Sequence, residues 1–131
     1  MDKRIAVVYV LIDASEGRIA GYYTLSSLSV ELPGDASKGL PKYPEYPATL
    51  LGRLAVDESY QGQGLGGRIL LDALGRALAG SRAVASYAVI TDAKDEAAES
   101  FYARYGFSPL GTEDGGRRMF LPMGTVERLF V

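Results

Sequence analysis

The chain has 131 residues, a net charge of −2 and 47% hydrophobic residues, ordinary values for one globular domain with a real core. It contains no cysteine and no histidine, which excludes disulfides, thiolate nucleophiles, Ser-His-Asp catalysis and the usual zinc sites. The slightly acidic balance gives no overall basic surface for nucleic acid, although a local basic patch stays open.

The first part of the chain predicts strands and one long loop. Residues Ile5–Ile12 are apolar throughout, which predicts a strand buried on both faces, and the run is too short to span a membrane. No clear signal-peptide cleavage pattern follows it, so we expect a cytoplasmic protein. A turn over Asp13–Gly17 and a strand over Arg18–Val30 complete an antiparallel hairpin. Four prolines in Glu31–Thr49 predict a loop, either functional or a plain surface excursion.

The second part of the chain alternates strands with helices. The expected elements are the strand Leu50–Val56, a helix over Leu65–Leu78, the strand Ala83–Ile90, a helix from an Asp95 cap to Tyr105, a turn at Asp114–Gly116, the strand Arg117–Leu121 and a short helix over Thr125–Phe130. The order β-β-β-α-β-α-β predicts a single α/β (α+β) domain over residues 1–131. Its sheet should be mixed, mostly antiparallel and flanked by helices.

A glycine-rich stretch separates the strand Leu50–Val56 from the first helix. Residues 62–67 hold four glycines in six positions. Glycine permits a tight turn and leaves room for a ligand beside the backbone, and the free N–H groups of a helix start attract anions. Strand, glycine turn and helix therefore predict a phosphate cradle. The glycine spacing alone favours a tight turn that holds no ligand, and the rest of the chain has to decide.

Three segments together resemble the GCN5-related N-acetyltransferases (GNAT). They are Leu54-Ala55-Val56, Gln61-Gly62-Gln63-Gly64-Leu65-Gly66 and Ala98–Phe107. The resemblance implies that the glycine turn holds the pyrophosphate of acetyl-CoA, that the preceding strand lines the pantetheine arm, and that the Phe-Tyr helix closes the other side. The cofactor-binding residues it implies are Leu54, Ala55, Val56, Gln61, Gly62, Gln63, Gly64, Leu65, Gly66, Gly67, Arg68 and Asp95. Acetyl-CoA is then the cosubstrate, and no metal is expected.

The same resemblance implies direct attack of an amine on the thioester, with Tyr102 as the acid that protonates the leaving thiolate. A chain without cysteine agrees, because it forms no thiol acyl-enzyme. A tyrosine with a pKa near ~10 is protonated at neutral pH and can donate that proton. Purely structural roles stay open for two of these residues: Tyr102 could be an aromatic side chain packed in the core, and Asp95 could serve only as a helix cap.

A narrower resemblance is to the acetyltransferase toxins of bacterial toxin–antitoxin pairs. It rests on Leu51–Asp57, Ala93-Lys94-Asp95 and Met119–Met123. It implies the α-amine of aminoacyl-tRNA as acceptor, a ribbon-helix-helix antitoxin as partner, and a homodimer. We expect the first strand and two helices of those toxins to be missing, because the chain begins at their second strand.

Two other functions therefore stay open: a general acetyltransferase for protein N-termini or small amines, and a CoA-binding domain without catalysis.

The residues from which a local basic patch for tRNA would be built are Arg53, Arg68, Arg76, Arg82, Lys94, Arg104, Arg117 and Arg118. The alternative is a solvated spread of charge.

Overall fold

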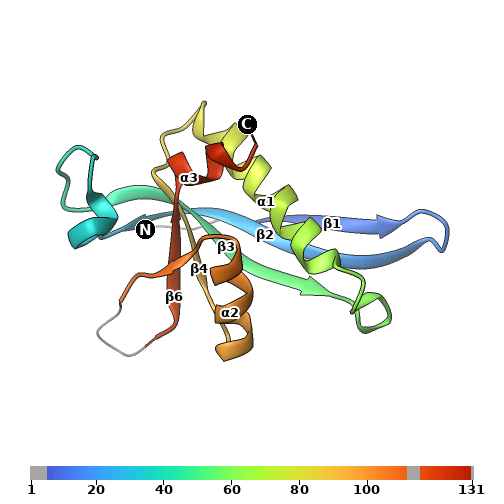
Figure 1. Cartoon of the computed structure of the whole chain (residues 1–131). Helices are drawn as coiled ribbons and strands as arrows, with labels where there is room; N and C mark the ends of the chain where they lie inside the picture. The colour runs from blue at the N-terminus through green and yellow to red at the C-terminus, as the bar shows by residue number, and fades with distance from the viewer. Residues whose placement is uncertain (1–5, 112–115, 131) are drawn as a thin grey trace.

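The computed structural model describes residues 6–111 and 116–130, which form one sheet with three α-helices (Figure 1). The strands are β1 (Val7–Asp13), β2 (Arg18–Val30), β3 (Tyr46–Val56), β4 (Ala88–Asp92), β5 (Ser108–Pro109) and β6 (Arg118–Pro122). The helices are α1 (Leu65–Ser81), α2 (Glu96–Arg104) and α3 (Met123–Arg128), with 3-10 turns η1 (Gly34–Ser37) and η2 (Glu58–Tyr60). The sheet order is β1-β2-β3-β4-β6-β5, and among these strands of the described residues only β3 and β4 pair in parallel. The predicted mixed, mostly antiparallel α/β fold is confirmed.

The expectation that the first strand is buried on both faces is wrong. In the described part of the chain, β1 pairs with β2 alone and forms an edge of the sheet. Val8 and Ile12 are each 58% exposed, and Val7 and Val10 are each 50% exposed. An apolar run predicts a strand well, but the place of that strand in the sheet depends on partners that the run itself does not specify.

Several expected boundaries also shift. β3 begins at Tyr46 rather than Leu50, because Pro47 is accommodated in the strand opposite Ser29 of β2, so the predicted loop is shorter. α1 continues to Ser81, and β4 therefore begins at Ala88 rather than Ala83. The short strand β5 was not expected, and α3 begins two residues before Thr125. The predicted turn at Asp114–Gly116 lies mostly outside the described residues.

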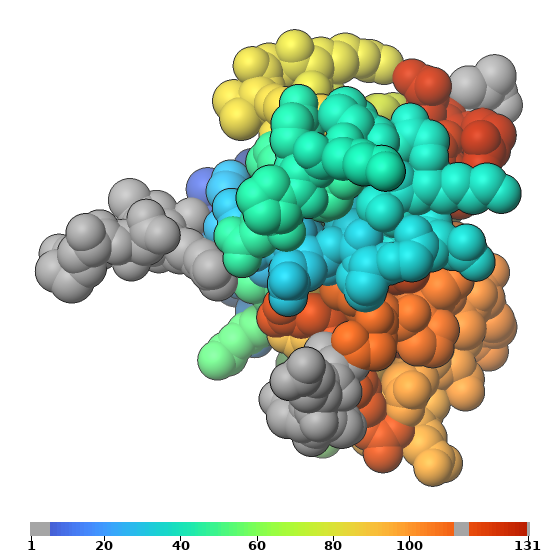
Figure 2. Space-filling view, turned by 90° about the vertical axis from the view of Figure 1, so that its left-hand side faces the viewer, coloured from blue at the N-terminus to red at the C-terminus, as the bar shows by residue number. Residues whose placement is uncertain are grey.

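Two hydrophobic clusters cover the two faces of the sheet. All three helices pack on one face, around Leu51, Leu70 and Leu121. On the other face the segment after β2 folds back, and Leu32 and Tyr46 pack with Ile90 of β4. Figure 2 views the molecule from the end at which the segment after β2 lies, and this segment is in front of the sheet there. The helical face carries the predicted acetyl-CoA residues, so the site is built there.

Candidate functional site

The central feature of the site is the place where the parallel strands β3 and β4 part. They pair at three positions, the last of which joins Leu51 to Thr91. β3 then continues to Val56 beside β2, whereas β4 ends at Asp92 beside β6, and the two strands diverge in Figure 1. Among residues 6–111 and 116–130, no strand pairs with the β4-facing edge of residues 53–56. This backbone edge can therefore bind an extended ligand as an added strand would.

A β-bulge shapes β3 at the point of divergence. Tyr23 pairs with Leu54 and Leu25 pairs with Leu51, so Gly52 and Arg53 together oppose the single residue Thr24. The backbone N–H of Arg53 donates a hydrogen bond to Oγ1 of Thr24 at 3.0 Å, and a Cβ on Gly52 would meet that oxygen at 2.7 Å. Bulges redirect backbone groups and are common beside active sites. The sequence signal for this bulge is the glycine inside an apolar strand.

The glycine turn forms one end of a groove of about 360 Å³. Gly62 and Gly64 have φ of 82° and 76°, a left-handed conformation that favours glycine. Gly64 caps α1 without a side-chain hydrogen bond, and the first turn of this fully described helix contains no acidic residue. The N–H groups that begin α1 are thus available to an anion. Eight predicted residues line the groove, namely Leu54, Ala55, Val56, Gln61, Gly62, Gly64, Leu65 and Gly66.

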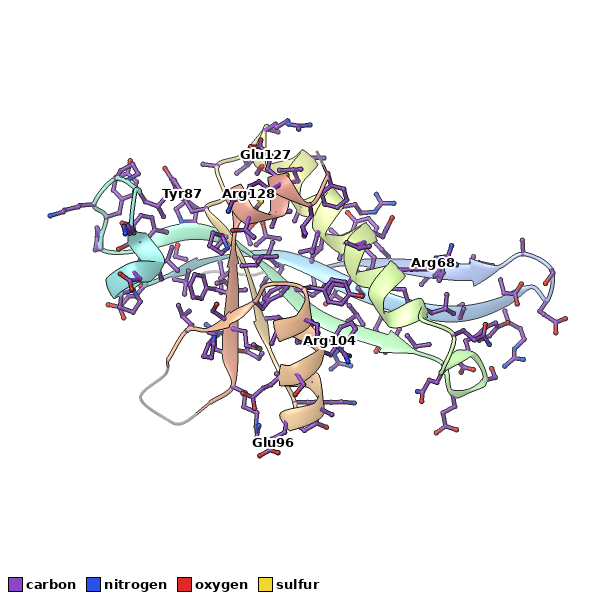
Figure 3. All side chains as sticks on the ribbon, viewed as in Figure 1. Arg68, Tyr87, Glu96, Arg104, Glu127 and Arg128 are labelled. Carbon is purple, nitrogen blue, oxygen red and sulfur yellow. The ribbon has the colours of Figure 1, made fainter. Side chains whose placement is uncertain are left out.

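The other four predicted cofactor residues lie outside the lining of this groove. Gln63 is exposed, and Gly67 faces α2, where a Cβ would overlap the Tyr105 hydroxyl. Arg68 extends from α1 toward β1 and β2, where it borders a separate hollow (Figure 3). Asp95 caps α2, because its carboxylate accepts a hydrogen bond from the backbone N–H of Ala98 at 2.8 Å. Tyr60, Lys94 and Phe101 line the groove and were not predicted as cofactor residues.

Tyr102 lies in the core of the helical face, close to the divergence of β3 and β4. Its side chain is 7% exposed and packs between Phe101 and Phe107, with ring centroids 5.2 Å and 5.3 Å away. Burial raises the pKa of Tyr102, and hydrogen bonding with the Thr91 side chain offsets this rise only in part. The buried Thr91 hydroxyl donates to the carbonyl oxygen of Leu51 at 3.0 Å. The phenol therefore stays protonated at neutral pH, beside the last paired rung of the two strands.

Charges around the site are partly neutralised within the chain. Among the residues expected to form a basic patch, Arg76, Arg117 and Arg118 pair with Asp72, Glu99 and Asp92. Lys94 instead lines the same groove as Gly62 and Gly64. Neither a cluster of three or more potential metal ligands nor a helix able to cross a membrane occurs within the described residues.

The groove borders the free edge of β3 and the uncapped start of α1, which fits an elongated phosphate-bearing cosubstrate. Tyr102 does not line this groove; it lies buried beside Thr91, where β3 and β4 part, and its protonated phenol fits a reaction that needs an acid. The family model described as "Acetyltransferase (GNAT) domain" matches residues 4–109, and the chain belongs to this family. The GNAT resemblance of the sequence, including its similarity to acetyltransferase toxins, is thereby confirmed.

Two curated relatives are toxins. A "tRNA-acetylating toxin" of Mycobacterium tuberculosis is 37% identical over 95 residues, which cover 70% of this chain and 56% of the relative. A "Probable toxin TacT" of Sinorhizobium fredii is 30% identical over 132 residues, which cover 93% of this chain and 72% of the relative. The chain thus spans little more than half the length of the first relative and nearly three quarters of the second.

Solved structures of the toxin AtaT share the fold. AtaT complexed with acetyl-methionyl-tRNAfMet matches with a TM-score of 0.83 and 34% identity, covering 95% of this chain and 75% of AtaT. A mutant of AtaT bound to acetyl-CoA and to the C-terminus of the antitoxin AtaR matches with a TM-score of 0.78 and 32% identity, covering 95% and 72%. The relatives therefore include proteins solved with acetyl-CoA, with acetyl-methionyl-tRNAfMet and with an antitoxin segment.

Proposed function

We propose that the chain is a single catalytic domain that transfers the acetyl group of acetyl-CoA to a primary amine, the α-amine of aminoacyl-tRNA. The observation that carries this proposal is the parting of β3 and β4 next to the uncapped N-terminus of α1. It offers a strand edge and an anion cradle along one groove, the two features that an extended pantetheine arm and its pyrophosphate require.

Acetyl-CoA would lie along this groove with its pyrophosphate on the N–H groups of the glycine turn. The side chain of Lys94 borders the same groove and would add a positive charge for a phosphate. Pantetheine amides would pair with the free backbone edge at Leu54 and Val56. The thioester would then lie toward the bulge, and a backbone N–H of the free strand edge, other than that of Arg53 which donates to Thr24, would polarise its carbonyl.

The reaction needs few further groups. The neutral amine attacks the thioester carbon, the C–S bond breaks, and Tyr102 gives its proton to the departing thiolate. The phenoxide is then reprotonated from water, and the proton lost by the new amide nitrogen passes to water. An α-amine has a pKa of about 8, so roughly a quarter of it is already neutral at pH 7.5, and a dedicated base is unnecessary.

The tRNA acceptor is supported by the relatives, one named a tRNA-acetylating toxin and one solved with acetyl-methionyl-tRNAfMet. By the same reasoning we propose that this protein is neutralised by an antitoxin of the ribbon-helix-helix type, acts as a homodimer and works in the cytoplasm. The antitoxin-bound form of AtaT supports the first of these partners.

A cell-free translation assay with and without acetyl-CoA tests the proposal. We expect inhibition only with acetyl-CoA, together with an added mass of one acetyl group on the aminoacyl moiety of recovered tRNA. Acetylation of free peptides or polyamines, with aminoacyl-tRNA left unmodified, would replace the proposed acceptor by a general amine. Tight acetyl-CoA binding without turnover on any amine would overturn the catalytic assignment.

A further inference from the structure

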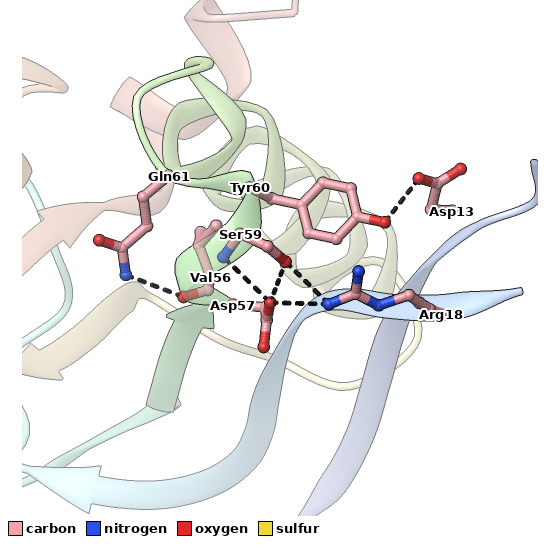
Figure 4. Close-up of polar contacts among 7 residues, drawn as sticks. All are labelled: Asp13, Arg18, Val56, Asp57, Ser59, Tyr60 and Gln61. Atoms are coloured by element: carbon pink, nitrogen blue, oxygen red, sulfur yellow. Dashed lines mark hydrogen bonds and ion pairs between the residues drawn. The ribbon is translucent and has the colours of Figure 1, made fainter. Parts of the chain in front are cut away.

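The segment that connects β3 to the glycine turn, residues 57–61, is held by the β1–β2 hairpin; we name it the entry loop. Asp13 is the last residue of β1 and Arg18 the first of β2, so they flank the hairpin turn. The Tyr60 hydroxyl donates a hydrogen bond to Oδ2 of Asp13 at 2.6 Å (Figure 4). The Arg18 guanidinium donates to Oγ of Ser59 at 2.9 Å and lies 3.5 Å from Oδ2 of Asp57.

Further bonds fix the entry loop between these two contacts. The backbone N–H of Asp57 donates to the carbonyl of Ala20 at 2.8 Å, and Ser59 donates to the Asp57 carboxylate. The amide of Gln61 donates to the carbonyl of Val56 at 3.1 Å. The loop is therefore tied to β2, to the hairpin turn and to the end of β3 immediately before the glycine turn begins.

The cofactor groove begins where these ties end. Tyr60 and Gln61 line the groove, whereas Asp13, Arg18 and Asp57 are absent from its lining. We propose that Asp13 and Arg18 are positioning residues for acetyl-CoA, which set the place of the glycine-turn N–H groups through Tyr60 and Asp57. This inference rests on the proposed function.

Charge gives the contacts a second effect. Asp13 and Asp57 bring two carboxylates close to a site meant for a polyanion. Hydrogen bonds from Tyr60 and Ser15 lower the pKa of Asp13, and those from Ser59 lower the pKa of Asp57, so both are ionised at neutral pH. The Arg18 guanidinium pairs with the Asp57 carboxylate and offsets its charge, whereas Asp13 belongs to the hairpin and acts by accepting the hydrogen bond of the Tyr60 hydroxyl. Loss of Arg18 would remove the guanidinium that offsets the Asp57 charge, and it would thereby weaken binding of the acetyl-CoA pyrophosphate.

The expected effect concerns binding more than stability. The Arg18 and Asp57 side chains are 54% and 47% exposed, and exposed ion pairs contribute little to the free energy of unfolding. Their loss should therefore leave the melting temperature nearly unchanged. Release of the entry loop should raise the Kd of acetyl-CoA by about 3- to 10-fold per variant, the size expected for one net hydrogen bond.

Calorimetry with acetyl-CoA on the full chain tests this inference, with the variants Asp13→Ala, Tyr60→Phe, their double variant and Arg18→Met. Asp35→Asn is the matched control, because Asp35 is an exposed acid in η1 on the other face of the sheet. We expect weaker binding in every variant except the control. For Asp13→Ala and Arg18→Met, whose residues do not line the groove, kcat at saturating acetyl-CoA should be unchanged. Because Asp13 acts through Tyr60, the Kd of acetyl-CoA for the double variant should not exceed the larger of the two Kd values of the single variants.

Unchanged Kd values for Asp13→Ala and Arg18→Met overturn the inference and leave the proposed function intact. If the fold-increase in Kd of the double variant equals the product of the two single fold-increases, the coupling between Asp13 and Tyr60 is overturned. Absence of acetyl-CoA binding by the unmodified chain overturns the proposed function itself and this inference with it.

Discussion

Replacement of Tyr102 by phenylalanine separates catalysis from folding in this protein. The substitution removes one oxygen from a ring that is 7% exposed and keeps its packing against Phe101 and Phe107. Thr91 retains its hydrogen bond to the Leu51 carbonyl, so no buried donor is stranded. We therefore expect the free energy of unfolding to change by less than about 1 kcal/mol. Loss of a positioned acid should lower kcat by roughly 10²- to 10⁴-fold, or about 3–5 kcal/mol of transition-state stabilisation.

The assay is single-turnover acetylation of methionyl-tRNA at saturating acetyl-CoA, with calorimetry to verify that the Kd of acetyl-CoA is unchanged. Tyr43→Phe is the control, because Tyr43 is 50% exposed and lies on the other side of the sheet from α2. A kcat of Tyr102→Phe within threefold of the unmodified chain would refute the acid role, and weaker cofactor binding would reassign the hydroxyl to the groove.

The pH dependence of the same pair of proteins provides an independent check. Burial raises the folded-state pKa of Tyr102 above its ordinary value of 10.0, so the protonated acid persists through pH 9. A raised folded-state pKa stabilises the fold below the unfolded pKa, and this contribution is lost as the pH rises through the folded one. Above about pH 10 the unmodified chain should therefore lose stability that Tyr102→Phe does not lose, measured by urea unfolding at fixed pH.

Three other substitutions probe separate parts of the site. Thr91→Val should lower the free energy of unfolding by about 1–3 kcal/mol in urea, because the buried Leu51 carbonyl loses its donor, and Thr91→Ser should recover most of it. Lys94→Ala should raise the Kd of acetyl-CoA by roughly 3- to 10-fold, and added salt should reduce this effect, whereas Lys94→Arg retains binding. An equal rise in Kd at low and high salt would argue against a charge contact. Gly67→Ala should lower the melting temperature, with a cost of about 1–3 kcal/mol, because its Cβ overlaps the Tyr105 hydroxyl; a gain in stability would show that Tyr105 moves aside freely.

Much of the fold followed from local signals. The periodic apolar stripe of α1, the Asp95 cap of α2 and the glycine turn are set by residues within a few positions of one another, and each lies where the sequence predicted it. Gly106 has a positive φ of 102° at the end of α2, as a left-handed residue after a helix requires. Short-range patterns of this kind depend on side-chain spacing and capping, which the sequence records directly.

Other features depended on contacts between distant segments. The apolar run at the start of the chain indicated a strand, but only the sheet order places β1 at an edge with its valines exposed. Gly67 is predicted as part of the phosphate cradle, and only the tertiary structure shows that Tyr105 packs against it. Arg68 follows the glycines in sequence but borders a different hollow, because a helical turn directs it away from the groove.

The sequence by itself thus determined the class of the protein, since the glycine turn and the Phe-Tyr helix are contiguous motifs tied to one cosubstrate. Only the tertiary structure decided how the groove is completed. Lys94 comes from the connection between β4 and α2, Phe101 comes from α2, and Tyr60 is held in place by Asp13, 47 residues earlier in the chain. Such contacts form when strands pair and helices dock, and no local pattern encodes them. The parting of β3 from β4 opens the strand edge, and it too depends on how the strands pair.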